Sequence, residues 1–363
     1  MLTRRPRLVA LATAVPPHVL RQAEVRERAG EMFAGVLPGD RRLLQVFEHG
    51  QVDTRNSCVP LEWFASERDF GEKNALYAEH AVRLAAAAAS AALDRAGLEP
   101  RDVDHVVFVS STGLSTPSVD AHLANALGMR SDVRRTPVWG LGCAGGAAGL
   151  AHAGDFALAD PSARVLLVAL ELCTLTFQLG DRTTRNLVAT SLFGDGAAAA
   201  IVAGPDAVLP AGRGVVPLAL VASRSTLWMG TQDVMGWTVD GAGLHVVFSR
   251  DIPAIVRERV RPGLLAFLEA NGLALADVRH LATHPGGAKV LQAYAEALEL
   301  PPGAFRHARD VLREHGNMSS PSCLFVLERF MRSGEIAAGD QVIVAALGPG
   351  FSAEYVLLRG GTA

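Results

Sequence analysis

The stretch GLEPRDVDH over Gly97–His105 decides the fold, because a related stretch, GLALADVRH, stands 175 residues later over Gly272–His280. Glycine-leucine, aspartate-valine and histidine recur at the same spacing in both copies. A helical pattern precedes each copy, over residues 81–96 and 255–271, and an apolar strand follows each. Self-similarity at a fixed offset predicts a duplicated structural unit.

The elements that follow the two copies correspond as well. Gly142–Gly146 (GCAGG) and Gly316–Ser320 (GNMSS) each precede a helix, and the apolar strands at 164–169 and 341–346 come next. Helical and short-strand patterns alternate along the whole chain, which is typical of a layered α/β protein. We therefore predict an α/β fold that is built from two duplicated halves.

The boundary between the halves is expected at the Pro/Gly-rich link 205–214, which gives units of residues 1–204 and 205–363. Duplicated halves meet around a pseudo-twofold axis. Because Cys143 and Asn317 occupy equivalent helix starts, we expect this axis to bring both residues to one central seam.

Composition excludes several classes of protein. The 363 residues carry a formal net charge of −3, with 49% hydrophobic and 20% charged residues, as in a globular rather than a disordered chain. No basic run indicates a nucleic-acid binder. No apolar stretch reaches the ~20 residues of a transmembrane helix, so no membrane span is expected.

The opening of the chain allows two interpretations. Arg4-Arg5, a short apolar run and Ala12-Thr13-Ala14 mimic a secretory signal with a cleavage site. The apolar run is very short and Pro16-Pro17 leads into a helical pattern, so we favour a first buried strand. The four cysteines lack the spacing of a metal site or a disulfide framework, which predicts no metal and a reducing cytoplasm.

Cys143 is the first candidate for chemistry. It opens a helix whose first turn is almost free of side-chain bulk, so a substrate could reach the sulfur. The partial positive charge at a helix N-terminus favours a thiolate over a thiol. The alternative is a small buried cysteine that packs in a glycine-rich turn.

His284 and Asn317 complete the candidate set. His284 stands in the strand-to-helix turn Thr283–Gly287, where an imidazole could pair with a thiolate and donate to an oxyanion. The Asn317 amide could donate a hydrogen bond without a change of charge. Taken singly, the histidine could be an ordinary surface or core residue and the asparagine a helix cap.

A family resemblance joins these residues. The runs Gly142–Gly146, His284–Gly287 (HPGG) and Gly316–Ser320 resemble the Cys–His–Asn signatures of the type III polyketide synthases, the chalcone synthase-like branch of the thiolase fold. Leu192–Ala197 (LFGDGA) and Gly348–Gly350 (GPG) are similar to the same family, in the expected order. The resemblance implies a five-layered αβαβα fold and a homodimer.

The resemblance also implies the roles of the three candidates. Cys143 would carry the acyl chain as a thioester, and His284 with Asn317 would stabilise the enolate formed when malonyl-CoA loses carbon dioxide. A dry pocket with fixed donors suits such a decarboxylation. The expected substrates are an acyl-CoA starter and malonyl-CoA, with no cofactor or metal.

Further site residues follow from the resemblance alone. Phe193 matches the aromatic gatekeeper between the coenzyme A tunnel and the cavity, and Thr116 matches a loop that reaches the partner's cavity. The implied substrate-binding set also includes Val246, Thr112, Glu171, Thr176, Ser319, Gly348, Pro349 and Gly350. The implied coenzyme A contacts are Arg55, at the tunnel mouth, Gly287 and Lys289.

The other three cysteines, Cys58, Cys173 and Cys323, are expected to pack in the core.

Two departures from the family pattern bear on the substrate. Val246 stands where plant chalcone synthases have a second gatekeeper phenylalanine, and Leu347 precedes the Gly-Pro-Gly loop where Gly-Phe is usual. The smaller Val246 predicts a larger cavity. We therefore expect a medium- or long-chain fatty acyl-CoA starter and an alkylpyrone, alkylresorcinol or related aromatic product, with a small or aromatic starter as the alternative.

Other functions are weighed against this one. A 3-oxoacyl-(acyl carrier protein) synthase III has a similar fold and the same three residue types but stops after one condensation. A thiolase needs a second cysteine near the C-terminus, and hydroxymethylglutaryl-CoA synthase needs an acidic residue beside the nucleophile; neither is present. A papain-type hydrolase does not accommodate the duplication. A non-catalytic acyl-CoA binder would release no carbon dioxide from malonyl-CoA.

Overall fold

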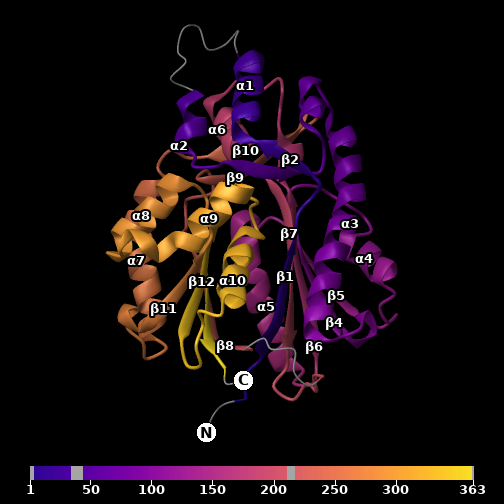
Figure 1. The fold of residues 1–363 in the computed structure, drawn as a ribbon, viewed down its shortest axis with the longest axis vertical. Coiled ribbons are helices and arrows are strands. Elements are labelled where there is room, and N and C mark those ends of the chain that lie inside the picture. Colours follow the sequence, from indigo (N-terminus) through magenta and orange to yellow (C-terminus); the bar gives the residue numbers. More distant parts are fainter. Residues whose placement is uncertain (1–3, 34–43, 211–216, 362–363) are drawn as a thin grey trace.

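A single mixed sheet runs through the whole molecule. The computed structural model describes residues 4–33, 44–210 and 217–361 (Figure 1). In these residues nine strands pair in the order β5-β4-β6-β7-β1-β8-β13-β12-β11. Their bounds, in that order, are Arg134–Val138, His105–Val109, Arg164–Leu172, Asp195–Ala203, Arg7–Ala14, Leu218–Leu227, Ser352–Gly360, Gln341–Gly348 and Val278–Thr283.

The repeated motif occupies equivalent places in the two halves. Gly97 ends α3 (Phe70–Ala96) with φ 69°, and Gly272 closes the turn after α7 (Ile252–Glu269) with φ 70°, a left-handed conformation that favours glycine. Asp102 accepts a hydrogen bond from the Glu99 amide at 2.8 Å, and Asp277 accepts one from the Ala274 amide at 2.7 Å. The shared residues therefore build the same turn from a helix into β4 or β11.

The predicted five layers are present. Helices α5 (Gly145–Ala159) and α10 (Ser322–Ser333) lie between the two halves of the sheet, and each contacts strands of both halves (Figure 1). Helices α3 and α4 (Val119–Leu127) cover one outer face. Helices α7 and α8 (Ala288–Leu298) cover the other. This arrangement is the αβαβα fold.

Small residues let the middle layer pack closely. A Cβ atom on Gly146 of α5 would lie 2.1 Å from the carbonyl oxygen of Ser320, which lies two residues before α10. A Cβ atom on Gly149 would lie 2.6 Å from Cδ1 of Leu167 in β6. The backbone of α5 therefore approaches its neighbours at a distance that only glycine allows.

The first strand is the centre of the sheet. β1 pairs with β7 of its own half and, through Arg7 and Leu8, with β8 of the second half. The interpretation of this segment as a buried strand agrees with its position.

Part of the predicted link between the halves, residues 211–216, lies outside the described residues, and the boundary at 204/205 remains a prediction. Within the described chain, no helix combines the length and apolar character needed to cross a membrane.

The remaining elements form a cap at one end of the sheet (Figure 1). The cap contains two small two-stranded sheets, one of β2 and β3 and one of β9 and β10. Neither sheet pairs with another described strand. It also contains helices α1, α2, α6 and α9. The bounds are β2 His18–Arg21, β3 Thr54–Ser57, β9 Met235–Asp240, β10 Gly243–Phe248, α1 Gln22–Phe33, α2 Val46–His49, α6 Thr184–Leu192 and α9 Arg306–His315.

Replacement of Gly146 by alanine tests the close packing of the middle layer. The added Cβ would overlap the Ser320 carbonyl, so we expect Gly146→Ala to lower the free energy of unfolding by about 2 kcal/mol or more. Urea unfolding followed by circular dichroism measures this change. Gly303→Ala is the matched control, because its Cβ would meet nothing within 4 Å. Equal stability of the two variants would contradict the packing argument.

Candidate active site

Cys143 lies in a tight turn just before α5. Its neighbour Gly142 has φ 47°, and a Cβ atom there would lie 2.8 Å from Cδ of Pro349. Cys143 itself is 6% exposed. The turn therefore holds the sulfur at the start of the central helix, in a place with little side-chain bulk around it.

His284 follows the last residue of β11. Its backbone amide donates to the Ala345 carbonyl of β12 at 2.8 Å, so the sheet fixes the start of the turn. The ring is buried, and neither ring nitrogen has a hydrogen-bond partner in the described part of the chain. Both nitrogens are therefore available to a group that enters the site.

Asn317 is held by its backbone and by its side chain. Its amide donates to the Leu192 carbonyl at 2.7 Å, and its carbonyl accepts from the Gly194 amide at 3.1 Å. Its side-chain Nδ2 donates to the Gly286 carbonyl at 3.2 Å, and its Oδ1 accepts from the Ser319 amide at 2.8 Å. One Nδ2 hydrogen remains for a substrate in a fixed direction.

The three side chains meet at one cavity. Cys143, His284 and Asn317 all line a cavity of about 1330 Å³, together with Leu347 and Phe248. Cys143 lies in the turn just before α5 and Asn317 in the segment before α10, so both are at the seam between the halves. The duplication argument therefore placed Cys143 and Asn317 correctly relative to each other.

The electrostatics of this site are dominated by burial. Burial raises the pKa of the Cys143 thiol to about 12 and lowers the pKa of the His284 imidazole to about 3. Hydrogen bonding with Ser319 and Asn317 acts on the Cys143 pKa in the opposite direction. Burial therefore opposes the thiolate that the helix start is expected to favour, and it favours a neutral thiol and a neutral imidazole.

This neutrality constrains the chemistry. A lone charge on either group would be costly in a buried site, whereas a proton transfer from sulfur to imidazole leaves the net charge of the pair at zero. A neutral imidazole can also donate a hydrogen bond to a developing oxyanion. The site can thus activate a nucleophile and stabilise an enolate with the same residue.

Glu171 lies in a closed hydrogen-bond network. One carboxylate oxygen accepts from the Ser111 amide at 2.9 Å and from the Thr112 hydroxyl at 2.8 Å, and the other accepts from Ser320 at 2.8 Å. Glu171 is fully buried, and burial raises its pKa to about 7. Glu171, Thr112 and Ser319 are not among the residues that line the two cavities described here. Their predicted contact with substrate stays a prediction.

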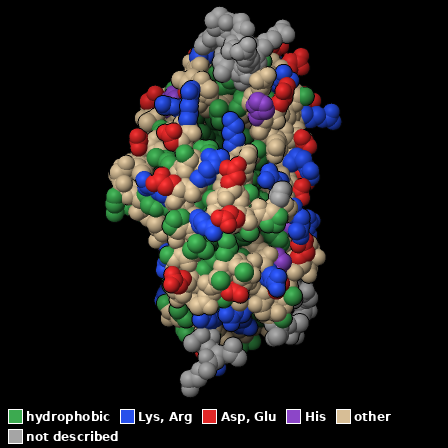
Figure 2. All heavy atoms as spheres, turned by 90° about the vertical axis from the view of Figure 1, so that its left-hand side faces the viewer, with side chains coloured by type: hydrophobic (Ala, Val, Ile, Leu, Met, Phe, Trp, Pro, Cys, Tyr) green, Lys and Arg blue, Asp and Glu red, His purple; other side chains and the backbone are tan. Residues whose placement is uncertain are grey.

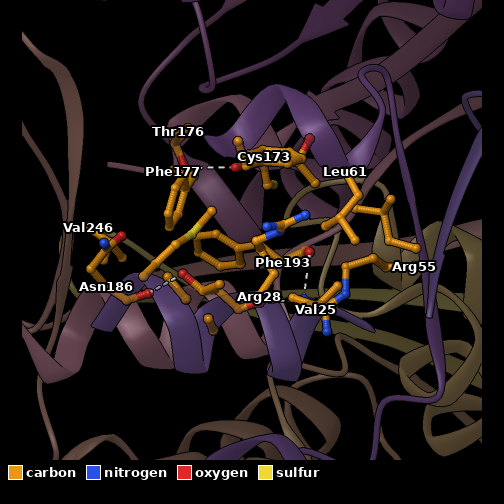
Figure 3. Close-up of a pocket in the computed structure, with 17 residues that line it drawn as sticks. Val25, Arg28, Arg55, Leu61, Cys173, Thr176, Phe177, Asn186, Phe193 and Val246 are labelled. Atoms are coloured by element: carbon orange, nitrogen blue, oxygen red, sulfur yellow. Dashed lines mark hydrogen bonds between the residues drawn. The ribbon is translucent and has the colours of Figure 1, made fainter. Parts of the chain in front are cut away.

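A second, narrower cavity of about 60 Å³ lies beside Phe193 (Figure 3). Its lining is mostly apolar and includes the predicted residues Phe193, Val246 and Thr176. In Figure 3 the Phe193 ring stands in the middle of the lining residues, with Val246 and Arg55 on opposite sides. Cys173 also lines this cavity, and it is buried and packs with Ala189 and Phe193, in agreement with its predicted packing role.

The prediction for Arg55 is also wrong. Arg55 was expected at the tunnel mouth, but it is only 2% exposed. Its guanidinium donates to three backbone carbonyls at the end of α6, those of Thr190 at 2.6 Å, Ser191 at 2.9 Å and Phe193 at 3.2 Å. The C-terminal carbonyls of a helix carry partial negative charge, which compensates a buried cation. Arg55 therefore holds the segment that carries Phe193.

Other basic residues stand where Arg55 was expected. Arg185 and Arg250 line the large cavity with the predicted Gly287 and Lys289. The face on the α7–α8 side is hollowed near its upper end in Figure 2, with blue basic side chains beside the recess. The sequence gives little sign of Arg185 or Arg250, because arginine is common throughout the chain.

The Gly-Pro-Gly loop packs behind the nucleophile. A Cβ atom on Gly348 would lie 2.5 Å from Cβ of Ala144, and Pro349 packs on Gly142. Leu347, just before the loop, is the residue that lines the large cavity. The structure thus gives Gly348 and Pro349 a packing contact, and substrate contact by Gly348, Pro349 and Gly350 stays a prediction. Thr116 is exposed in its loop, and its predicted reach to a partner is not tested.

Comparison with protein families decides the membership of the chain. Residues 65–206 match the model of the N-terminal domain of chalcone and stilbene synthases, and residues 219–362 match the model of their C-terminal domain. The chain belongs to the chalcone and stilbene synthase family. It is a type III polyketide synthase, an enzyme of the acyltransferase type.

Known relatives of the family cover nearly the whole chain. A 1,3,6,8-tetrahydroxynaphthalene synthase of Streptomyces peucetius subsp. caesius is 42% identical over 361 residues, 99% of this chain and 94% of the relative. The alpha-pyrone synthesis polyketide synthase-like protein Pks18 of Mycobacterium tuberculosis is 31% identical over 357 residues, 96% of this chain and 89% of the relative.

A solved structure supports the fold in the same way. The crystal structure of 1,3,6,8-tetrahydroxynaphthalene synthase from Streptomyces coelicolor A3(2), a bacterial type III polyketide synthase, superposes with a TM-score of 0.92 at 33% identity. It covers 98% of this chain and 100% of the other. The resemblance seen in the Cys–His–Asn motifs is therefore confirmed at the level of the family and the fold.

The raised pKa of Glu171 predicts a pH dependence of stability. A carboxyl group with a folded pKa near 7 binds protons more tightly in the folded state, so its contribution is full below pH 4.5 and is lost as the pH rises through 7. We expect wild type to lose ~1–3 kcal/mol more unfolding free energy than Glu171→Gln between pH 5 and pH 8.

Urea unfolding at three pH values measures this difference. Asp195, another buried carboxyl whose pKa burial raises to about 6, is present in both proteins and serves as the internal reference. Parallel pH profiles of the two proteins would show that the Glu171 proton is not linked to folding.

Proposed function

We propose that the enzyme loads a starter acyl group from an acyl-CoA onto Cys143 and extends it with malonyl-CoA by decarboxylative Claisen condensation. The observation that supports this most is the convergence of Cys143, His284 and Asn317 on one large cavity. The extended chain is then cyclised to an alkylpyrone, an alkylresorcinol or a related aromatic product. The reaction uses coenzyme A thioesters and no further cofactor.

The loading step is a transfer of the acyl group between sulfur atoms. The Cys143 sulfur attacks the thioester carbonyl while its proton moves to His284, so no lone charge is created in the buried pair. The bond from the carbonyl carbon to the coenzyme A sulfur breaks. The proton on His284 then passes to the departing thiolate, and the imidazole is neutral again.

The extension step uses the two fixed donors. Malonyl-CoA loses carbon dioxide, and the electron pair of the broken bond forms an enolate. The enolate oxygen accepts hydrogen bonds from the neutral His284 ring and from the free Nδ2 hydrogen of Asn317. The enolate carbon attacks the thioester on Cys143, a carbon–carbon bond forms, and the bond to the Cys143 sulfur breaks. The departing thiolate takes up one proton from solvent, which restores the neutral thiol.

Basic residues at the large cavity suit the phosphates of coenzyme A. Lys289 and Gly287 lie at the start of α8, and Arg185 and Arg250 line the same cavity. Arginine and lysine bind phosphate groups through charge-assisted hydrogen bonds. We assign the recognition of coenzyme A to this set in place of Arg55.

The preferred starter is a medium- or long-chain fatty acyl-CoA. Val246 leaves space beside the Phe193 ring, and the cavity there is lined mainly by apolar side chains such as Leu20, Val25 and Met32. Burial of a methylene chain against such walls is favourable by about 0.8 kcal/mol per methylene group. The relative Pks18, named for alpha-pyrone synthesis, is consistent with this choice.

A second candidate uses malonyl-CoA as both starter and extender. The small volume beside Phe193, about 60 Å³, and the 42% identity to a 1,3,6,8-tetrahydroxynaphthalene synthase favour it. A single experiment separates the two candidates, because only the second forms a product from malonyl-CoA alone.

The homodimer and the cytoplasmic location belong to the same proposal. β5 is an edge strand of the sheet, and Trp139, just after it, and Leu114, in the Thr116 loop, are both about half exposed. Exposed apolar side chains beside an open strand suit a second copy of the chain. The four cysteines are free thiols, and the proposed cytoplasmic location would keep them reduced.

Substitution of the three central residues tests the mechanism. We expect Cys143→Ala to abolish chain extension, because no thioester can form. His284→Gln and Asn317→Ala should each reduce decarboxylation by about 10²-fold or more, the effect typical of one lost oxyanion donor. Release of labelled carbon dioxide from radiolabelled malonyl-CoA measures both. Unchanged malonyl-CoA turnover in either donor variant would contradict its role.

A panel of starters tests the choice of substrate. The enzyme is incubated with malonyl-CoA and acyl-CoAs of two to sixteen carbons, and the products are identified by mass spectrometry. We expect the highest kcat/KM with fatty acyl-CoAs, and a loss of that preference in Val246→Phe, which fills the space beside Phe193. Product from malonyl-CoA alone, with no gain from any starter, would favour the second candidate instead.

A further inference from the structure

Lysine is rare in this chain. Of 34 basic residues other than histidine, only Lys73 and Lys289 are lysines. Lys289 lies at the large cavity, but Lys73 lies in α3, is 6% exposed, and has no part in the chemistry described above. A buried ammonium group is costly unless its hydrogen bonds are satisfied, so its partners indicate what it does.

The partners of Lys73 belong to the cap. Its Nζ donates to Oε1 of Gln178 at 2.6 Å and to the Ala242 carbonyl at 3.0 Å. Ala242 is at the tip of the hairpin formed by β9 and β10. Both acceptors are neutral oxygens, and burial lowers the pKa of Lys73 to about 8. The ammonium thus connects the long helix of the first half to a hairpin of the second half.

Two more hydrogen bonds hold the same tip. The Phe70 amide, at the start of α3, donates to the Gly241 carbonyl at 3.3 Å. Gln178, itself held by Lys73, donates through Nε2 to the Leu244 carbonyl at 3.3 Å. Gly243 has φ 134°, and a Cβ atom there would lie 2.8 Å from Nε2 of Gln178. The tip is therefore seated closely against α3 and Gln178.

The hairpin depends on such contacts for its position. β9 and β10 pair only with each other in the described chain, and a lone two-stranded hairpin is marginally stable in water. Its inner face carries Trp237, Val246 and Phe248. The rings of Trp237 and Phe248 stand 6.1 and 5.8 Å from the Phe193 ring, between centroids. The hairpin thus contributes Val246 to the wall of the cavity beside Phe193, and it contributes Met235, Val247 and Phe248 to the large cavity.

We propose that Lys73, together with Gln178, holds the β9–β10 hairpin at a fixed distance from Phe193 and thereby limits the length of the acyl chain that the enzyme accepts. Lys73 is a positioning residue for specificity, since it acts through the hairpin and not on the substrate. This inference rests on the proposed use of the cavity beside Phe193 for the acyl starter.

The geometry explains why loss of the ammonium would act on specificity and not on the central chemistry. Cys143 precedes α5, His284 follows β11 and Asn317 precedes α10, so none of the three lies on the hairpin, whose Val246 lines the cavity beside Phe193. A hairpin released at its tip moves one wall of the acyl cavity. The donors that stabilise the enolate stay in place.

Lys73→Met is the test, because methionine keeps an apolar chain of similar length and removes the donor. Hydrogen–deuterium exchange is measured for the peptides that cover residues 235–248, and kcat/KM is measured for short and long acyl-CoA starters. We expect at least fivefold faster exchange in the hairpin and at least a fivefold rise in the ratio of long-chain to short-chain kcat/KM. Decarboxylation of malonyl-CoA should change by less than twofold.

Two further variants complete the design. Arg83→Met removes an exposed cation of the same helix, which pairs with Glu79, and should change neither readout. Gly243→Ala disturbs the tip from the hairpin side and leaves Lys73 intact, so it should reproduce the effect of Lys73→Met even if that variant folds poorly.

The outcomes are separable. Unchanged hydrogen exchange of the hairpin in both Lys73→Met and Gly243→Ala would show that Lys73 does not hold the hairpin. Faster exchange with an unchanged ratio of long-chain to short-chain kcat/KM would show that the hairpin position does not set specificity. A wild-type enzyme that forms no product from any acyl-CoA and malonyl-CoA would overturn the proposed function and the specificity claim with it, whereas the exchange data would still decide whether Lys73 holds the hairpin.

Discussion

The close contact between α5 and the segment before α10 is the constraint on which the rest of the structure depends. Gly146 lets the two backbones approach so closely that a Cβ atom would overlap the Ser320 carbonyl. The same contact brings Cys143, just before α5, near Asn317, in the segment that precedes α10. A duplicated fold thus produces an asymmetric site, because equivalent positions carry a thiol in one half and an amide in the other.

Burial gives this site its chemical character. The cost of an isolated charge favours a neutral Cys143 thiol and a neutral His284 imidazole, and the proposed loading step moves a proton between them without a change in net charge. The same neutral imidazole can serve as a donor to an enolate. In the proposed mechanism, one buried pair therefore serves both acyl transfer and decarboxylation.

The cap around Phe193 is built differently from the central layers. Arg55 holds the backbone of Phe193, the bridge to Asn317 connects that segment to the catalytic centre, and Lys73 holds the hairpin on the opposite side. Each of these contacts joins residues that are distant in the sequence. The size of the acyl cavity is consequently a property of long-range hydrogen bonds as well as of the side chains that line it.

The sequence by itself determined the duplication and pointed to the three candidate central residues, whereas the layer order and the roles of those residues came from the family resemblance of its motifs. The repeated turn could be predicted because its parts depend on residues that are near one another in the sequence. A glycine in the left-handed conformation, as at Gly97 and Gly272, is such a part. Only the tertiary structure decided that Arg55 is buried, that Cys173 lines a cavity, and that Arg185 and Arg250 stand at the large cavity. Burial and cavity lining depend on which distant segments pack together, and no local pattern in the sequence records that packing.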